Sequence, residues 1–312
     1  MSETFDPRVP FRSASGRKQG LSRREMTGKR FRRVHRDCYV SAEHDLDFET
    51  RALAALEMVP GAYGLSHQSA VTWCGGIAPD TPDIHLAVPH RLRCELPGIR
   101  VHRYRTAPLL WTRRGVRVTA PAQTFTDLGA TTDLVDLVVA GDSLVRRTSV
   151  TPSELAAFAR QAHSNGVGRA RQASEFVRAD VDSAQESRSR MLIVLAGLPE
   201  PTVNLRFYTA EGALLRRMDM GYKAIKVAVE YDGRQHIERK ANWGADIGRR
   251  EYFEGLGWRF IILIASDIWT IPGRTVRRVH DILGERGAKL GPVHDDWRLH
   301  FPDRGGFDVE SA

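Results

Sequence analysis

Residues 225–233 read Ile225-Lys226-Val227-Ala228-Val229-Glu230-Tyr231-Asp232-Gly233, and this stretch decides how the C-terminal part of the chain folds. Its apolar residues predict a buried strand that ends in two carboxylates, Glu230 and Asp232. Side chains two residues apart on a strand project from the same face. Burying these carboxylates is costly unless a partner neutralises them. The one base in the stretch is Lys226, about 13 Å from Glu230 along a strand that rises about 3.3 Å per residue.

A regular order of elements surrounds this strand. Ser183 is expected to cap a helix that has Glu186 at its N3 position. We predict strands over 202–208, 213–220 and 224–232, a helix over 246–256, a buried strand over 258–264 and a last helix after Pro272. The order is α-β-β-β-α-β-α, with Asp219 on the second strand. If the second and third strands form a hairpin across Gly221, Asp219 approaches the face that carries Glu230.

Acidic residues in this arrangement point to a divalent cation. Hard oxygen ligands suit Mg²⁺ or Mn²⁺. A cation beside a basic surface suggests phosphodiester hydrolysis, because the cation polarises a phosphoryl oxygen and activates a bound water. His236 is a candidate for proton transfer, since histidine titrates near neutrality. Each residue also has a structural reading: Glu186 as a capping residue, Asp219 and Asp232 as turn residues, and His236 as a structural histidine.

The positive charge is concentrated at the N-terminus. The formal net charge is +8, from 46 Lys and Arg against 38 Asp and Glu. Residues 1–36 contain eleven basic and three acidic residues, and this difference of eight equals the charge of the whole chain. A local excess of this kind favours contact with a polyanion, with an affinity that falls as salt rises. The alternative is a solvated tail. The expected DNA-binding residues are Arg23, Arg24, Lys29, Arg30, Arg32 and Arg33.

The chain as a whole is expected to be a mixed α/β protein of the α+β kind. Residues 1–19 are polar and basic and are expected to form a flexible arm. Ser22 and Glu25 predict a capped short helix followed by a strand-like wing, which is compatible with a reduced winged helix over 20–40. The predicted divisions are an α+β region over 20–165, a helical linker over 166–182, the C-terminal domain over 183–298 and a tail over 299–312.

Composition and cysteine content bound the class of protein. A hydrophobic content of 42% and a charged content of 27% fit a globular protein with an ample core. Cys38, Cys74 and Cys94 are far apart and lack zinc-site spacing, which favours a reducing compartment. The sequence has no apolar leader and no stretch near ~18 apolar residues. A cytoplasmic protein without a membrane contact is therefore expected.

The C-terminal pattern resembles a known nuclease family. Residues 183–286 look like the branch of the PD-(D/E)XK superfamily related to very-short-patch-repair endonucleases. The resemblance implies a restriction-endonuclease-like core in which Asp219 and Glu230 bind the metal. We expect Asp232 and Glu186 to be supporting ligands or residues that orient water. Asp232 stands where the family pattern has a lysine, and this departure concerns the mechanism more than the site. The matching residues are Glu186-Ser187, Met218-Asp219, Val229-Glu230-Tyr231-Asp232-Gly233, His236, Asp246, Arg249 and Gly257-Trp258.

The N-terminal half resembles abortive-infection antitoxins of the type IV class. The resemblance lies in Phe31 to Val40, Ser66 to Val71 and Val118 to Leu128. It implies an autoregulating, DNA-binding N-terminal module. Gln123 departs from the basic residue expected before Thr124.

These features predict a Mg²⁺- or Mn²⁺-dependent DNA endonuclease, an enzyme whose basic N-terminal region holds the duplex while the C-terminal domain cuts it. The alternative is a non-enzymatic DNA-binding transcriptional regulator or antitoxin with a degenerate nuclease-like domain, which the missing lysine favours. An RNA nuclease is a third reading, since nothing in the sequence reports on a 2′-hydroxyl. The recognition site and the oligomeric state stay open.

Overall fold

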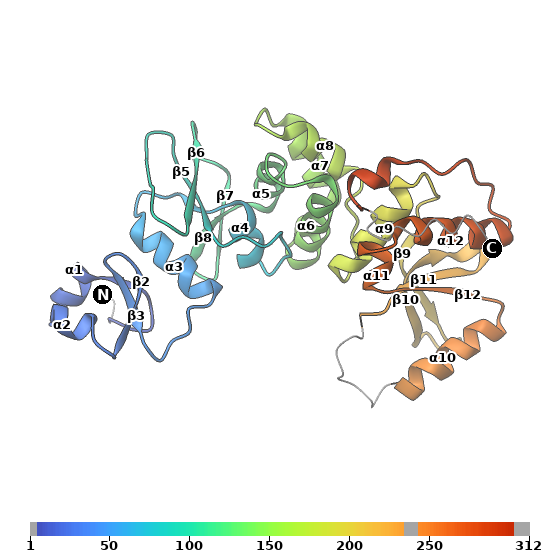
Figure 1. Ribbon diagram of the computed structural model, residues 1–312, viewed down its shortest axis with the longest axis horizontal. Helices are drawn as coiled ribbons and strands as arrows, with labels where there is room; N and C mark the ends of the chain where they lie inside the picture. Colours follow the sequence, from blue (N-terminus) through green and yellow to red (C-terminus); the bar gives the residue numbers. More distant parts are fainter. Residues whose placement is uncertain (1–4, 234–242, 303–312) are drawn as a thin grey trace. The chain divides into compact units, whose positions relative to one another are not determined.

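The computed structural model describes residues 5–233 and 243–302 of the chain. The chain divides into two compact units, Met1–Thr132 with Ser153–Arg171, and Asp133–Pro152 with Gln172–Ala312. Within the described residues there are sheets of three, five and four strands, each accompanied by helices (Figure 1). The predicted α+β class is therefore confirmed. In the same residues no helix has both the length and the apolar character needed to cross a membrane.

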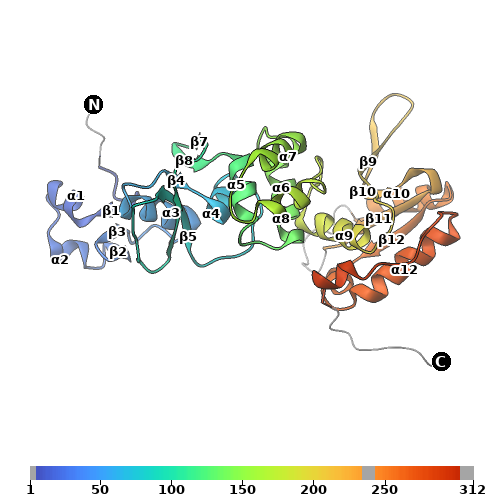
Figure 2. The same cartoon turned by 90° about the horizontal axis from the view of Figure 1, so that it is seen from above.

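The first unit begins with a small module of helices and strands. Its sheet has the order β1 (Phe11–Arg12), β3 (Cys38–Ser41), β2 (Phe31–His35), and both pairings are antiparallel. Helices α1 (Ser13–Lys18) and α2 (Arg23–Met26) lie between β1 and β2 in the chain (Figure 2). Ser22 caps α2 in a capping box with Glu25, as predicted. Within 20–40 the structure thus has one short helix followed by a hairpin, and the winged-helix assignment of this range stays a prediction.

Residues 11–18 differ from the flexible arm expected over residues 1–19, because they form β1 and α1. The cause is an aromatic core. The Phe11 ring packs edge-on against Phe5 and Phe31, with centroids 5.0 and 5.5 Å apart. Met26 and Tyr39 complete this cluster. A single buried phenylalanine thus orders a segment whose composition is polar.

A five-stranded sheet forms the rest of the first unit, with strand order β6-β5-β4-β8-β7. Helix α3 (Phe48–Met58) precedes the sheet in the chain, and Asp47 caps it by accepting the Thr50 amide. The sheet contains two short strands that sequence reasoning missed, β4 and β7. The remaining elements are β4 (Gly64–Leu65), α4 (His67–Trp73), β5 (Ile84–Pro89), β6 (Ile99–Tyr104), β7 (Leu110–Arg113), β8 (Val116–Thr119), α5 (Pro121–Leu128), α7 (Pro152–Gln161) and α8 (Val167–Ser174).

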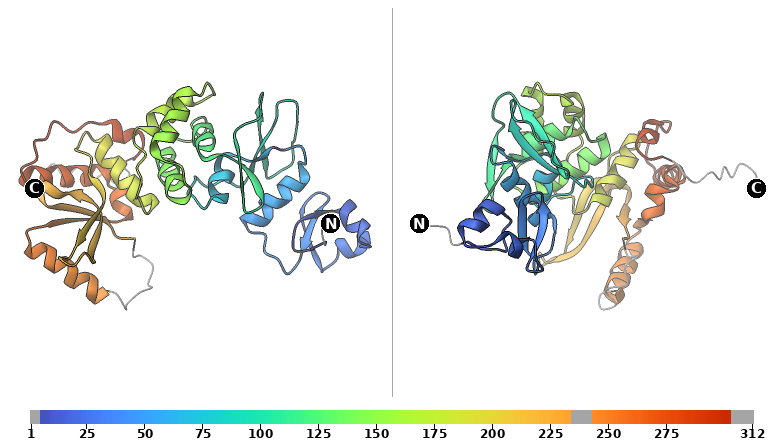
Figure 3. Two further views of the ribbon diagram at one scale, coloured as in Figure 1. Left: turned by 180° about the vertical axis from the view of Figure 1, so that it is seen from behind. Right: turned by 60° about the vertical axis from the view of Figure 1, so that its left-hand side comes forward.

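The second unit is built on a four-stranded sheet of order β12-β11-β10-β9. β9, β10 and β11 are antiparallel neighbours, and β12 runs parallel to β11. Helix α10 covers one face, and α9, α11 and α12 lie on the other (Figures 1 and 3). The bounds are α9 (Ala184–Leu195), β9 (Thr202–Tyr208), β10 (Leu214–Tyr222), η1 (Lys223–Ile225), β11 (Val227–Tyr231), α10 (Trp243–Gly255), β12 (Arg259–Leu263), α11 (Ala265–Trp269), α12 (Pro272–Glu285) and η2 (Asp296–Leu299).

The predicted order of elements is confirmed, with α11 as an additional short helix. Under α10 the core consists of Met218, Ala228, Phe253, Trp258 and Phe260. The third strand begins later than predicted, because residues 223–225 form η1 and Lys226 takes a left-handed φ of 54°.

The boundary between the units also differs from the predicted one. Helix α6 (Leu134–Arg147) was assigned to the N-terminal region, yet it belongs to the second unit and packs on α9. Arg190 of α9 is fully buried and pairs with the buried Asp142 of α6 at 2.9 Å. Ser187 donates a 2.7 Å hydrogen bond to the same carboxylate. Separating α6 from α9 would leave a buried arginine without its buried partner, so the two helices act as one unit.

Candidate functional site

Asp219 lies where the β10–β11 ladder ends. The ladder pairs Met220 with Val229, and one residue further the Asp219 carboxylate accepts the Tyr231 amide at 2.9 Å through Oδ2. The pKa of Asp219 is raised to about 7, chiefly by burial and in addition by the charges of Glu186 and Glu230, while the Tyr231 amide and Arg217 oppose the rise. β10 and β11 therefore form the predicted hairpin, which brings Asp219 within electrostatic reach of Glu230. The turn lies at Lys223–Ile225 and Lys226, whereas the predicted turn residue Gly221 is paired with Ala228 inside the ladder.

Glu230 has a partner that sequence reasoning missed. Arg216 of β10 donates through Nη2 to both Glu230 oxygens, at 2.7 and 2.9 Å, and its guanidinium stacks 5.0 Å from the Phe260 ring centroid. The sequence shows directly which bases neighbour Glu230 along its own strand, whereas Arg216 lies on the adjacent strand. The sequence feature that could have indicated this partner is the pair Arg216-Arg217, on the strand that carries Asp219. Glu230 is thus neutralised by a guanidinium in the structure.

Glu186 combines a capping position with proximity to Asp219. Ser183 Oγ accepts the Glu186 amide at 3.2 Å, as predicted, and the Glu186 carboxylate accepts the Asp182 amide at 3.0 Å. Burial raises the pKa of Glu186, although the Asp182 amide opposes this. Glu186 is therefore at the N3 position of a capped helix, as its structural reading predicts. Its carboxylate also raises the pKa of Asp219.

The remaining predicted residues lie differently. Asp232 follows β11, where its amide donates to the Leu263 carbonyl at 2.7 Å. His236 lies outside the described residues. Lys226 donates through Nζ to the Leu256 carbonyl at 2.9 Å, at the other end of β11 from Glu230. Lys226 is therefore no partner for the acidic residues, in line with the expectation from its distance along the strand.

The donor set fits a divalent cation that takes few protein ligands. Among the described residues, no three His, Cys, Asp or Glu side chains are grouped as a ready metal site. Mg²⁺, however, commonly uses one or two carboxylates and keeps several waters. From the described residues Asp219 receives one hydrogen bond, on Oδ2, and the Asn204 Oδ1 atom is buried with no hydrogen-bond partner. Asp219 and Glu230 offer carboxylate oxygens, and these are hard donors of the kind that Mg²⁺ or Mn²⁺ binds.

The six basic residues predicted to contact DNA are all exposed and share the N-terminal module. Arg23 and Arg24 lie on α2, Arg32 and Arg33 on β2, and Lys29 and Arg30 in the turn that joins them. One weak pairing occurs, between Arg30 and Glu25 at 3.9 Å. The module therefore presents these charges to solvent on neighbouring elements.

A second buried polar group lies in the five-stranded unit and was not predicted. His67, His85 and His102 form a stack, with the His67 and His102 centroids 3.4 Å apart and a 3.0 Å hydrogen bond between His85 Nδ1 and His102 Nε2. Burial lowers the pKa of His85 to about 4 and that of His102 to about 3, and it lowers the pKa of His67 well below its ordinary value. Because all three pKa values are lowered, the rings are neutral at pH 7 and the cluster is an uncharged structural layer.

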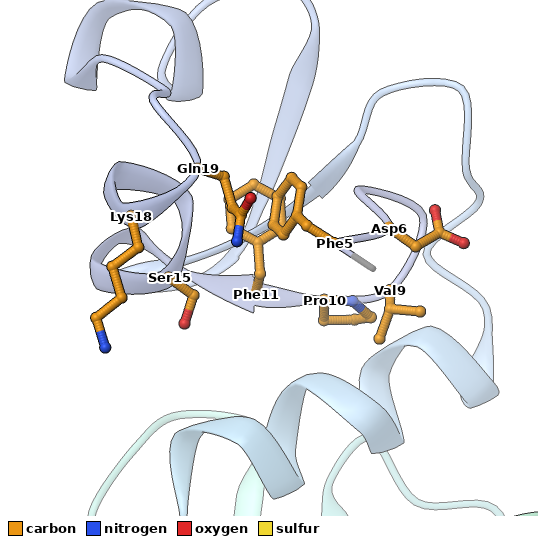
Figure 4. Close-up of a pocket in the computed structure, with 8 residues that line it drawn as sticks. All are labelled: Phe5, Asp6, Val9, Pro10, Phe11, Ser15, Lys18 and Gln19. Atoms are coloured by element: carbon orange, nitrogen blue, oxygen red, sulfur yellow. The ribbon is translucent and has the colours of Figure 1, made fainter. Parts of the chain in front are cut away.

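An open cavity of about 510 Å³ lies beside α1 and contains none of the predicted site residues. Figure 4 shows Phe5, Val9, Pro10 and Phe11 as its apolar part, with Lys18 and Gln19 on α1 and the following turn. The cavity and the acidic residues of β10 and β11 are therefore separate features.

Comparison with known proteins gives relatives but no assigned activity. No family model matches the chain. The uncharacterized proteins MT2308 and Rv2248 of Mycobacterium tuberculosis, from strains CDC 1551 / Oshkosh and ATCC 25618 / H37Rv, are each 26% identical over 249 residues, which is 79% of this chain and 90% of theirs. The crystal structure of the RV2827C protein from Mycobacterium tuberculosis is similar with a TM-score of 0.39 and 14% identity, covering 66% of this chain and 85% of that one.

Proposed function

We propose that this protein is a metal-dependent endonuclease that hydrolyses phosphodiester bonds in DNA. The observation that carries the proposal is the half-buried Asp219 carboxylate at the end of the β10–β11 ladder, with Glu230 and Glu186 within electrostatic reach. Carboxylates from two strands and a helix thus gather at one strand end. Like charges at a partly buried site are unfavourable in the metal-free protein, and a bound cation offsets them.

The sheet that carries these residues supports the same proposal. α9 precedes the antiparallel strands β9, β10 and β11, and α10 leads to β12 beside β11. This α-β-β-β-α-β order is the one on which the resemblance to PD-(D/E)XK nucleases rests. Neighbouring strands then supply Asp219 and Glu230, the two ligands that the resemblance implies.

Each residue has a role in the proposed site. Asp219 and Glu230 would hold Mg²⁺ or Mn²⁺, which supplies polarisation of a phosphoryl oxygen and activation of water. The Tyr231 amide fixes the Asp219 carboxylate through Oδ2. Arg216 orients Glu230 and places a positive charge where a phosphate is to bind. Supporting roles are proposed for Asp232 and Glu186 in orienting water and for His236 in proton transfer.

The basic N-terminal module would hold the DNA. Its six exposed bases lie on α2, β2 and the turn between them, so they are available to phosphates without breaking buried contacts. Phosphate contacts of this kind release counterions, and affinity then falls steeply with salt. The module thus supplies affinity, and the acidic site supplies the chemistry.

A cleavage assay tests the catalytic part of the proposal. Purified full-length protein is expected to nick supercoiled plasmid in Mg²⁺ or Mn²⁺ and to stop when a chelator is added. Asp219→Asn and Glu230→Gln are expected to lose at least about a hundredfold in rate, because each removes a charged ligand. Asp281→Asn on the exposed face of α12 is the matched control and should cut like the wild type. Equal cutting by Asp219→Asn and wild type would contradict the site.

A binding assay tests the basic module. Replacing Arg32 and Arg33 with Gln is expected to weaken DNA binding and to reduce the slope of log affinity against log salt by about two, one per phosphate contact. Arg274→Gln with Arg277→Gln, on exposed positions of α12, removes the same charge elsewhere. Fluorescence anisotropy with a labelled duplex at several salt concentrations measures both. An unchanged slope in the first variant argues against the module as the DNA contact.

A DNA-binding regulator without catalysis is the second candidate. The observation that favours it is the Arg216–Glu230 pair, because a guanidinium already neutralises one proposed ligand. Binding without cleavage in Mg²⁺ and Mn²⁺, across single-stranded, duplex and mismatched DNA, would support this candidate. Cleavage of RNA with no cleavage of DNA would instead assign the same site to an RNA nuclease.

A further inference from the structure

Asn204 has an unusual backbone conformation for a residue inside a strand. It lies within β9, yet its φ is 52°, in the left-handed region. Residues other than glycine adopt this region at an energetic cost, and Asn tolerates it better than most. Strain of this kind persists where the surroundings impose it and gathers at functional sites.

The position of this strained residue is defined by the β9–β10 ladder. Met218 pairs with Leu205 and Met220 pairs with Val203, so Asn204 and Asp219 lie between the same two pairs of the ladder. The strained residue of β9 is therefore the cross-strand neighbour of the half-buried carboxylate of β10.

The Asn204 side chain also has an unsatisfied polar atom. Its Oδ1 oxygen is buried and accepts no hydrogen bond from the described residues. An orphaned acceptor is unfavourable in a buried position, so it calls for a donor or a cation. Asp219, on the neighbouring strand, is a carboxylate on which the charges of Glu186 and Glu230 act.

We propose that Asn204 is a metal-binding residue, whose Oδ1 serves as a neutral oxygen ligand to the divalent cation held by Asp219. This inference rests on the proposed function and names a ligand that the sequence pattern did not contain. A neutral ligand suits this position, since Glu186 and Glu230 already surround Asp219 with negative charge. Backbone strain and an unpaired oxygen at one residue then have a common explanation.

Cation binding to the full-length protein tests the inference without relying on activity. Mn²⁺ affinity is measured by electron paramagnetic resonance and Mg²⁺ affinity by calorimetry. Asn204→Gly is expected to weaken both by about tenfold, because glycine keeps the left-handed backbone but removes the oxygen. Asn204→Asp keeps an oxygen and adds charge, so it is expected to bind Mn²⁺ at least as tightly as wild type. Asn165→Gly, at an exposed loop position, is the matched control and should leave affinity unchanged.

The outcomes separate this inference from the function on which it rests. Wild-type binding that Asp219→Asn abolishes and Asn204→Gly leaves intact would overturn the role of Asn204 alone. No measurable Mn²⁺ or Mg²⁺ binding by the wild type would overturn both proposals. Melting curves of Asn204→Gly are expected to match or exceed those of the wild type, since the strain is relieved. If that variant fails to fold, a fall in Mn²⁺ affinity in Asn204→Asp decides against the inference.

Discussion

At the scale of single residues, Asp219 shows how a proposed catalytic site differs from a stable core. A carboxylate is placed where burial and two further acids oppose its ionisation. Arg216 relieves the same problem for Glu230 by direct pairing. From the described residues Asp219 receives the Tyr231 amide and the charge of Arg217, without a paired base. Asp219 and Glu230, which have the same predicted role as metal ligands, therefore differ in how their negative charge is compensated.

Asp219→Asn is expected to stabilise the metal-free protein at pH 8 by about 1–3 kcal/mol. The folded pKa of Asp219, about 7, lies above the unfolded value of 3.8. The folded state therefore gains from the bound proton below pH 7 and loses that gain as pH rises through 7. Guanidinium unfolding with chelator at pH 8 and pH 5 should show a larger benefit of the variant at pH 8. An equal benefit at both values, or the same effect from Asp281→Asn, would contradict this account.

At the scale of elements, the buried histidines join α4, β5 and β6 of the five-stranded sheet. His67, His85 and His102 lie on these three elements in turn, and each ring is packed against another. Arg100 lowers the pKa of His85 and His102, and Asp83 opposes this only for His85. The layer is neutral as packed. A proton on any one ring would place a charge beside the two remaining neutral rings, away from water.

Acid is therefore expected to destabilise this sheet. Each histidine has a folded pKa below its unfolded value of 6.5, so the unfolded state binds protons first as pH falls. Stability should be highest above pH 6.5 and fall towards pH 4, by up to about 4 kcal/mol per pH unit if all three take up protons on unfolding. Urea unfolding at pH 7.5, 6.0 and 5.0 measures the slope. His102→Gln should reduce the slope of stability against pH by the contribution of about one proton. His90→Gln, at an exposed position, should leave the slope unchanged.

At the scale of the whole molecule, the units do not follow the order of the chain. Residues 133–152 belong with the C-terminal sheet, although residues 153–171 belong with the N-terminal one. The buried Arg190–Asp142 pair explains this assignment, with Glu200 as a second partner of Arg190 at 3.1 Å. A buried guanidinium requires its carboxylate, so α6 is part of the second fold.

A fragment that begins at Ser183, the boundary predicted from sequence, is expected to be less stable than one that begins at Asp133. Loss of one partner of a buried ion pair costs about 3–5 kcal/mol. Circular dichroism should show a cooperative melt for residues 133–312 and a lower or broader one for residues 183–312. Identical melts would mean that α6 is dispensable. Asp142→Asn in the longer fragment isolates the ion pair from the remaining contacts of α6.

Sequence reasoning reached the order of elements in the second unit and the positions of Asp219, Glu186 and Glu230, because those depend on local periodicity and spacing. It missed Arg216, which reaches Glu230 across strands, and Asn204, whose backbone conformation no composition reveals. It missed β1 and α1 because Phe11 stabilises them through contacts with later residues. The predicted roles of Asp232 and His236 stay predictions.

The sequence alone determined that buried strands alternate with helices, that acids stand at the ends of two of those strands, and that positive charge gathers at the N-terminus. These properties follow from the pattern of side chains along a single segment. The tertiary structure decided which acid is paired, which is buried with other acids, and which helix completes the second unit. Those outcomes depend on contacts between residues distant in the chain, and their energies come from burial and charge that exist only after the segments meet.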